Sequence, residues 1–120
     1  GRKRVLVVDD EASIRELLSK TLAINEYDVD TVGDGAAALD RVRASAYDLM
    51  IADLKMPGMD GLTLVREARR LGARLPVIII TGYSSESTAI EALNLGVAGY
   101  LTKPFRIPEV LKKAAEAIKA

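Results

Sequence analysis

The chain has 120 residues, its 17 Lys and Arg balance its 17 Asp and Glu, and it contains no His, Cys or Trp. This length fits a single domain over residues 1–120, and the missing His and Cys exclude thiol nucleophiles, disulfides, phosphohistidine formation on this chain and the usual structural zinc sites. Because the net charge is zero and no apolar run approaches the roughly 18 residues of a membrane helix, we expect a cytoplasmic protein that contacts neither nucleic acid nor membrane.

The first half of the chain alternates between strand and helix patterns. Residues 5–8 form an apolar run, which predicts a strand buried on both faces. Residues 28–32 alternate polar and apolar side chains, which indicates a half-exposed strand at a sheet edge. Between these strands we predict a helix whose capping box pairs Ser13 with Glu16 and whose buried stripe contains Ile14, Leu17, Leu18, Thr21 and Leu22.

The second half of the chain repeats this alternation. Buried strands are predicted at 48–52 and 76–80, and a weaker strand at 97–102. Pro57 and Gly58 punctuate a loop over 54–60. The helix patterns lie at about 35–45, from about 62 to a stop near Gly72, at 85–95 and at 107–118.

Five strand–helix units in succession predict a parallel sheet with helices on both faces. A closed barrel would need eight units, so we expect an open, doubly wound α/β fold of the flavodoxin-like type. The edge character of residues 28–32 favours the strand order 2-1-3-4-5. In such sheets the functional site lies beyond the carboxyl ends of the strands, so candidate site residues are expected at that edge.

Five polar side chains stand at those predicted strand ends: Asp9, Asp10, Asp53, Thr81 and Lys103. Each has a simpler explanation when taken alone, as a solvated turn, a helix-dipole partner, a strand end or a surface loop residue. Taken together, they place three carboxylates, a hydroxyl and an ammonium on the one edge that the fold assigns to function.

The charges of this group indicate its chemistry. Three neighbouring carboxylates repel one another unless cations neutralise them, and Lys103 supplies only one positive charge. Oxygen ligands without His or Cys suit a hard divalent ion, and few carboxylates in an open pocket suit Mg²⁺. A carboxylate beside Mg²⁺, an ammonium and a hydroxyl is equipped to accept a phosphoryl group.

The motifs around these residues resemble the receiver domain of bacterial two-component response regulators over nearly the whole chain. The resemblance rests on residues 7–11, 53–61, 81–83 and 100–105, which read VVDDE, DLKMPGMDG, TGY and YLTKPF. The loop and residues 81–105 are more weakly similar to receivers of the nitrogen-regulator, sigma-54 activator type.

The resemblance implies a role for each matching position. Asp53 would be the phosphoacceptor and would take its phosphoryl group from a phosphohistidine on a sensor histidine kinase or phosphotransfer protein. Asp10, Asp53 and the backbone carbonyl of Lys55 would ligate Mg²⁺ directly, and Asp9 would act mainly through a metal-bound water. The domain would promote its own phosphorylation and the hydrolysis of its aspartyl phosphate without being an enzyme in the usual sense.

The resemblance also implies a switch. Thr81 and Lys103 would bind the phosphoryl group, Tyr100 would turn inward, and the peptide bond between Lys103 and Pro104 would be cis. The face formed by the fourth helix, fifth strand and fifth helix would then control an output domain or downstream protein, with transcription regulation as the expected role. A homodimer formed through that face on phosphorylation is compatible with the resemblance. A tyrosine packed on an edge strand is the simpler explanation of Tyr100, and both can hold.

Two further positions are expected to tune the reaction. The resemblance points to Lys55 and Tyr83, at positions that vary widely in the family: each follows a site residue by two positions and would lie at the mouth of the pocket. We hypothesise that their bulk obstructs the hydrolytic water and lengthens the life of the phospho-aspartate.

A dinucleotide-binding enzyme is the best rival. Gly33, Gly35 and Ala38 match the G-x-G-x-x-A fingerprint, and Asp53 follows about 20 residues later, as a ribose ligand would. The motif follows the predicted edge strand, however, so a turn with a helix cap is the simpler interpretation.

The residues leave two more functions open. A phosphatase with an aspartyl nucleophile would need a general acid and a cap domain, for which 120 residues leave little room. A degenerate receiver that acts only as a protein-binding module is disfavoured by the intact acidic group, although the sequence does not exclude it.

Overall fold

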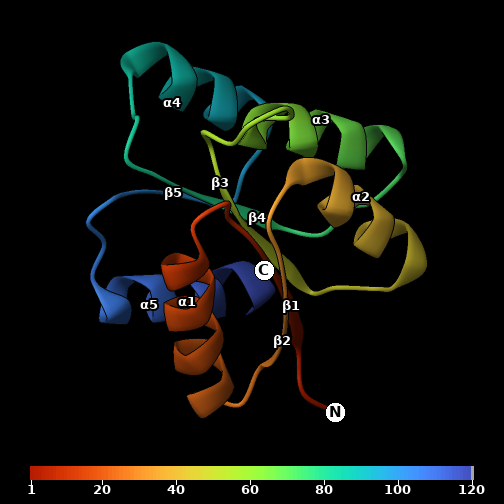
Figure 1. Ribbon diagram of the computed structural model, residues 1–120, viewed down its shortest axis with the longest axis vertical. Coiled ribbons are helices and arrows are strands. Elements are labelled where there is room, and N and C mark those ends of the chain that lie inside the picture. The colour runs from red at the N-terminus through yellow and green to blue at the C-terminus, as the bar shows by residue number, and fades with distance from the viewer. Residues whose placement is uncertain (120) are drawn as a thin grey trace.

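Five strands and five helices alternate along the chain in the computed structural model, which describes residues 1–119 (Figure 1). The strands are β1 (Arg4–Val8), β2 (Asp28–Val32), β3 (Leu49–Asp53), β4 (Val77–Thr81) and β5 (Gly99–Thr102). The helices are α1 (Ala12–Ile24), α2 (Gly35–Ala44), α3 (Gly61–Arg70), α4 (Glu86–Asn94) and α5 (Ile107–Lys119). No helix in residues 1–119 combines the length and hydropathy needed to cross a bilayer.

The strands form one parallel sheet in the order β2-β1-β3-β4-β5, so the predicted topology is confirmed. β2 is an edge strand, as its alternating polar and apolar residues predicted. Helices α1 and α5 lie on one face of the sheet, and α2, α3 and α4 lie on the other (Figure 1). The order of the strands reverses between β1 and β3, which makes their carboxyl ends the place where a crevice opens.

The central strands are buried on both faces, and this explains why their sequences do not alternate. Every residue of β3 and β4 is buried, and successive side chains enter opposite halves of the core. Met50 and Ile79 pack beneath α2, α3 and α4, whereas Ile51 and Ile78 pack beneath α1 and α5. Two apolar layers therefore hold the strand ends in a fixed register.

Two predictions about α1 are wrong. The helix begins at Ala12, so the N-cap is Glu11 and Ser13 lies within the first turn, too late to form a capping box with Glu16. Leu17 is 44% exposed instead of buried. Its position lies at the margin of the apolar stripe and borders a surface groove rather than the sheet.

Strand β5 begins two residues later than predicted. Val97 belongs to the C-terminal end of α4 and not to the strand, because its N–H donates to the carbonyl oxygen of Ala92 at 3.3 Å. Ladder bonding then begins at Ala98, whose N–H donates to the carbonyl of Val77 at 2.8 Å. Gly96, between α4 and these residues, adopts φ of 73°, a conformation in which glycine is favoured at the end of a helix.

Candidate functional site

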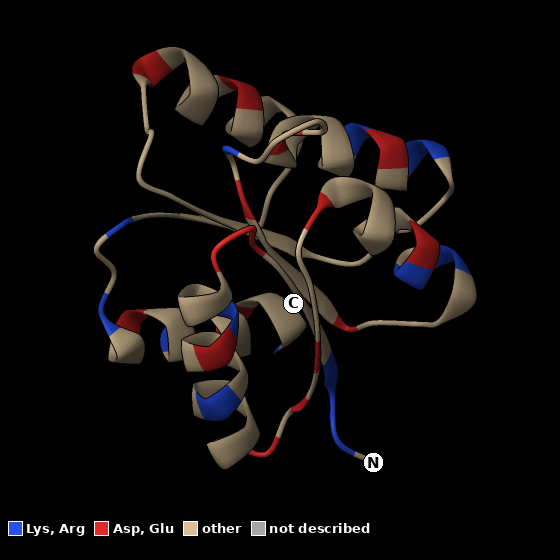
Figure 2. Cartoon of the chain, in the orientation of Figure 1, with Lys and Arg blue, Asp and Glu red and all other residues tan. Residues whose placement is uncertain are grey.

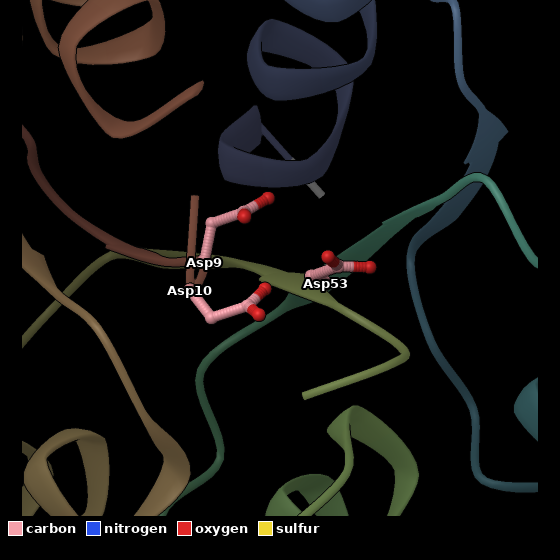
Figure 3. A group of neighbouring side chains, drawn as sticks. All are labelled: Asp9, Asp10 and Asp53. Atoms are coloured by element: carbon pink, nitrogen blue, oxygen red, sulfur yellow. The ribbon is translucent and has the colours of Figure 1, made fainter. Parts of the chain in front are cut away.

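Three carboxylates meet at the carboxyl ends of β1 and β3. Asp9 and Asp10 directly follow β1, and Asp53 is the last residue of β3, its neighbour in the sheet. One carboxylate oxygen from each residue lies within 4.8 Å of the other two (Figure 3). Asp9 and Asp53 are buried, whereas Asp10 is exposed to solvent, so the group is open on one side.

Lys103 reaches this group from the loop after β5. Its Nζ lies 3.1 Å from Asp9 Oδ2, 3.2 Å from Asp53 Oδ2 and 3.2 Å from Glu11 Oε1. The peptide bond between Lys103 and Pro104 is cis. The lysine side chain is 16% exposed and the carboxylates of Asp9 and Asp53 are only 3% and 4% exposed, so the central ion pairs are largely shielded from water.

Burial and charge act against each other in these pairs. Burial raises the pKa of Asp9 above its ordinary value, although the Glu11 N–H and Lys103 partly offset that rise by hydrogen bonding to the carboxylate. Burial also tends to lower the pKa of Lys103, but its hydrogen bonds to Asp9 and Asp53 outweigh that tendency and raise the pKa. Lys103 is therefore a permanent cation at neutral pH, placed directly beside the Asp53 carboxylate.

The donor atoms of this group fit a hard divalent cation. Among residues 1–119 only oxygen ligands converge here, and the three aspartates outnumber the Lys103 ammonium, which contacts Asp9 and Asp53. Figure 2 shows acidic segments gathered where β1 and β3 end, with α1 starting beside them. An excess of carboxylate oxygen with one exposed ligand is the donor set that Mg²⁺ prefers, because this ion retains several waters.

Thr81 ends β4 in the same way that Asp53 ends β3. It is the last residue of β4, which pairs directly with β3, and it is completely buried. Its Oγ1 accepts a hydrogen bond from the Tyr83 backbone N–H at 2.9 Å. The hydroxyl is thus held at the carboxyl edge of the sheet by the start of the loop that leads to α4.

Tyr100 lies on β5, farther from the aspartates. The ring is half-buried against the core beneath α4. Its hydroxyl donates to Ser84 Oγ at 3.0 Å and lies 3.3 Å from Thr88 Oγ1. Hydrogen bonds therefore link this tyrosine to both the β4–α4 loop and the first turn of α4.

Lys55 and Tyr83 border the same cavity, which none of the three aspartates lines, so their place at the mouth of the phosphoacceptor pocket stays a prediction. The Lys55 Nζ lies 5.8 Å from the centroid of the Tyr83 ring, within the range of a cation–π contact. Both residues line a cavity of about 170 Å³ between the β3–α3 loop and α4. The backbone N–H of Lys55 also donates to Asp53 Oδ1 at 3.3 Å, which helps to orient the carboxylate.

Sequence reasoning missed three residues that shape the site. Glu11 contacts Lys103, and Arg15 Nη1 donates to the Asp9 carbonyl at 2.7 Å. Gly61 donates its N–H to the Leu54 carbonyl at 2.8 Å and lets α3 begin directly against β3. The motif contained Glu11 without indicating its partner, because the contact joins residues that are 92 positions apart.

The glycines of the dinucleotide fingerprint do not form a phosphate cradle at this site. They follow β2, the edge strand, and Asp34 between them accepts a hydrogen bond from the Ala37 N–H at 2.8 Å. Gly35 instead allows close contact with the Met59 side chain, since a Cβ there would lie 2.9 Å from it. The turn with a helix cap is confirmed.

Comparisons with known proteins agree on one family. The family model described as "Response regulator receiver domain" matches residues 5–115. The response regulator MprA of Mycobacterium tuberculosis (strain ATCC 25618 / H37Rv) is 38% identical over 110 residues, which are 92% of this chain and 48% of MprA. The chain thus spans about half the length of the curated relatives it matches.

Two solved structures extend the comparison to the fold. The chemotaxis protein CheY4 of Vibrio cholerae is 33% identical, with a TM-score of 0.92 over 98% of this chain and 99% of that chain. A CheY-like response regulator receiver domain protein from Methanospirillum hungatei JF-1 is 28% identical, with a TM-score of 0.95 over 99% and 95% of the two chains.

Proposed function

The chain belongs to the response regulator receiver domain family, and on that premise we propose that it is a phosphorylation-activated signalling switch with Asp53 as its phosphoacceptor. One observation carries the proposal: a buried carboxylate at the end of β3 touches a half-buried ammonium, and two further carboxylates stand beside it. The aspartates and the lysine that the sequence analysis singled out are the residues that meet there.

The proposed step is an in-line transfer to Asp53. A carboxylate oxygen of Asp53 forms a bond to phosphorus while the bond from phosphorus to the imidazole nitrogen of a donor phosphohistidine breaks. The electron pair of that bond stays on the imidazole, which takes up a proton. Lys103 is already 3.2 Å from the Asp53 carboxylate and, with the Thr81 hydroxyl, would donate hydrogen bonds to the phosphoryl oxygens.

Asp10, Asp53 and the Lys55 carbonyl would hold Mg²⁺ directly, and Asp9 would do so through water. When bound, the ion would supply positive charge against the phosphoryl oxygens. Asp9 and Asp53 are oriented in advance, because the Glu11 and Lys55 N–H groups donate to them at 2.9 Å and 3.3 Å. The chain therefore holds two of the three carboxylates in place by backbone hydrogen bonds.

The same pocket would promote hydrolysis of the aspartyl phosphate. Its rate depends on water reaching the phosphorus opposite the Asp53 oxygen. Lys55 and Tyr83, which each follow a site residue by two positions and make a cation–π contact with each other, would restrict that access. We propose that this pair sets the lifetime of the phosphorylated form.

The switch would act through Thr81 and Tyr100. Phosphorylation adds nearly two negative charges and three acceptor oxygens, which attract the Thr81 hydroxyl. Its shift would disturb the hydrogen bond from the Tyr83 N–H and, through the β4–α4 loop, the bond between Tyr100 and Ser84. A pre-existing equilibrium of the α4–β5–α5 face would move toward the active form.

We propose a sensor histidine kinase or phosphotransfer protein as the phosphodonor. The target would be an output domain or downstream protein, acting in transcription regulation in the cytoplasm, with no direct nucleic-acid or membrane contact by this domain. A homodimer formed through the α4–β5–α5 face on phosphorylation belongs to the same proposal.

Intact-mass spectrometry tests this function. Incubation with acetyl phosphate and Mg²⁺ should add one phosphoryl group to the wild type and none to Asp53→Asn. Asp28→Asn, which alters an exposed carboxylate on β2, should be phosphorylated like the wild type. Failure of the wild type to gain mass would contradict the proposal and favour a degenerate receiver that acts only as a binding module.

A further inference from the structure

Glu11 occupies the N-cap position of α1 but does not cap the helix. Its backbone is extended, and its side chain accepts no hydrogen bond from the first turn. Instead the carboxylate reaches across to Lys103, with Oε1 at 3.2 Å from Nζ. The Glu11 carboxylate therefore contacts a site residue instead of the free backbone N–H groups at the start of α1.

The contact completes the hydrogen bonding of the Lys103 ammonium. An ammonium group has three hydrogens, and three carboxylates lie within hydrogen-bonding distance of Nζ: those of Asp9, Asp53 and Glu11. Asp9 and Asp53 are buried, whereas the Glu11 side chain is 57% exposed. Glu11 therefore places an exposed negative charge beside the lysine that contacts Asp53.

We propose that Glu11 determines phosphodonor specificity by electrostatic repulsion, disfavouring small anionic donors at Asp53. This inference rests on the proposed function of Asp53. A small donor brings its negative charge to the site without other contacts to offset the repulsion. A protein donor gains binding energy elsewhere on its surface, so the same repulsion weighs less on it.

The size of the effect follows from the geometry. The two 3.2 Å contacts through Lys103 Nζ place the Glu11 oxygen no more than about 6.4 Å from the Asp53 oxygen that would attack. Coulomb's law at that separation in water gives about a threefold effect for each unit of donor charge. Salt of about 1 M reduces the Debye length to about 3 Å and should remove most of it.

Two small phosphodonors that differ in net charge distinguish electrostatic repulsion from other effects of the Glu11 side chain. Acetyl phosphate is a dianion near neutral pH, and its transfer to an Asp53 oxygen breaks the phosphorus–oxygen bond, with acetate leaving with the electron pair. Phosphoramidate carries a protonated nitrogen and is a monoanion overall, and its transfer breaks the phosphorus–nitrogen bond and releases ammonia. Both reactions end in the same aspartyl phosphate.

The test measures initial phosphorylation rates by intact mass at saturating Mg²⁺ and low ionic strength. Glu11→Gln keeps an oxygen that can accept from Lys103 and removes only the charge. We expect kcat/KM to rise about tenfold with acetyl phosphate and about threefold with phosphoramidate, and both gains to vanish in about 1 M salt. Glu11→Asp restores the charge and should restore the wild-type ratio between donors.

Glu16→Gln is the matched control, because this exposed carboxylate lies on the same helix and pairs with Lys20 rather than Lys103. It should leave both rates unchanged. An unchanged donor ratio in Glu11→Gln, with normal phosphorylation of Asp53, overturns this inference alone. Absence of phosphorylation in wild type and variant alike overturns the proposed function instead.

Discussion

Replacing Asp10 with asparagine should stabilise the domain when Mg²⁺ is absent. Asp10 is the exposed member of the three carboxylates that gather within 4.8 Å, and it follows the buried Asp9 directly. Lys103 bonds to Asp9 and Asp53, so the charge of Asp10 has two like-charged neighbours and no direct ion pair among residues 1–119. The site therefore stores repulsion that a bound cation would relieve.

The magnitude follows from the separation of the carboxylates. Two unit charges about 5 Å apart in the dielectric of water repel by about 1 kcal/mol. Asp10→Asn removes two such repulsions and part of the attraction exerted by the nearby ammonium. The expected gain is about 1 kcal/mol in the free energy of unfolding, or about 4 °C in Tm for a chain of this length.

Thermal unfolding followed by circular dichroism, with EDTA at low ionic strength, measures this gain. Mg²⁺ at about 100 times its Kd should stabilise the wild type by about 2.7 kcal/mol and the variant by much less, which reverses their order. Asp28→Asn on β2 is the control and should change stability by less than about 0.5 kcal/mol in either condition. An Asp10→Asn protein that is less stable than the wild type in EDTA would show that repulsion at Asp10 does not destabilise the domain.

Three further predictions follow from particular contacts. Gly61→Ala should lower the free energy of unfolding by about 2 kcal/mol or more, since the added Cβ would lie 2.3 Å from a backbone oxygen of β3. The control is Gly82→Ala, whose Cβ would have its nearest neighbour at 3.8 Å and which should leave stability unchanged. Urea unfolding compares the two variants. Lys55→Ala and Tyr83→Ala should each shorten the half-life of the aspartyl phosphate severalfold, measured by loss of the phosphoryl mass, and unchanged half-lives would end the proposed shielding. Burial, together with a hydrogen bond to a carboxylate, raises the pKa of Tyr47, so its contribution to stability is complete below about pH 10 and is lost as pH rises through the raised value. The wild type should therefore lose more stability than Tyr47→Phe between about pH 8 and about pH 11, and parallel losses would contradict this.

The fold was predictable because its signals are periodic and long. Runs such as residues 77–80 are buried on both faces, which only a covered parallel sheet provides, and residues 28–32 alternate because β2 is an edge. Local details were less predictable. The position of Leu17 depends on how α1 is rotated against the sheet, and the true start of that helix depends on the turn after Asp9, which periodicity does not describe.

The candidate site also has features that the sequence predicts and features that it does not. Asp9, Asp53, Thr81 and Lys103 were found because the topology brings all parallel strand ends to one edge. The contact between Glu11 and Lys103 was missed, because it depends on side-chain directions that neither spacing nor hydropathy encodes. The roles assigned to the site residues, the ligation of Mg²⁺ by the Lys55 carbonyl and the similarity to nitrogen-regulator receivers stay predictions.

The role of Asp53 as phosphoacceptor can be tested by a crystal structure of the domain with Mg²⁺ and beryllofluoride, a stable mimic of a phosphoryl group. We expect beryllium bonded to a carboxylate oxygen of Asp53, fluorines within hydrogen-bonding distance of Lys103 Nζ and Thr81 Oγ1, and Mg²⁺ ligated by Asp10 and Asp53. Beryllofluoride bound elsewhere, with Asp53 still paired only to Lys103, would contradict it.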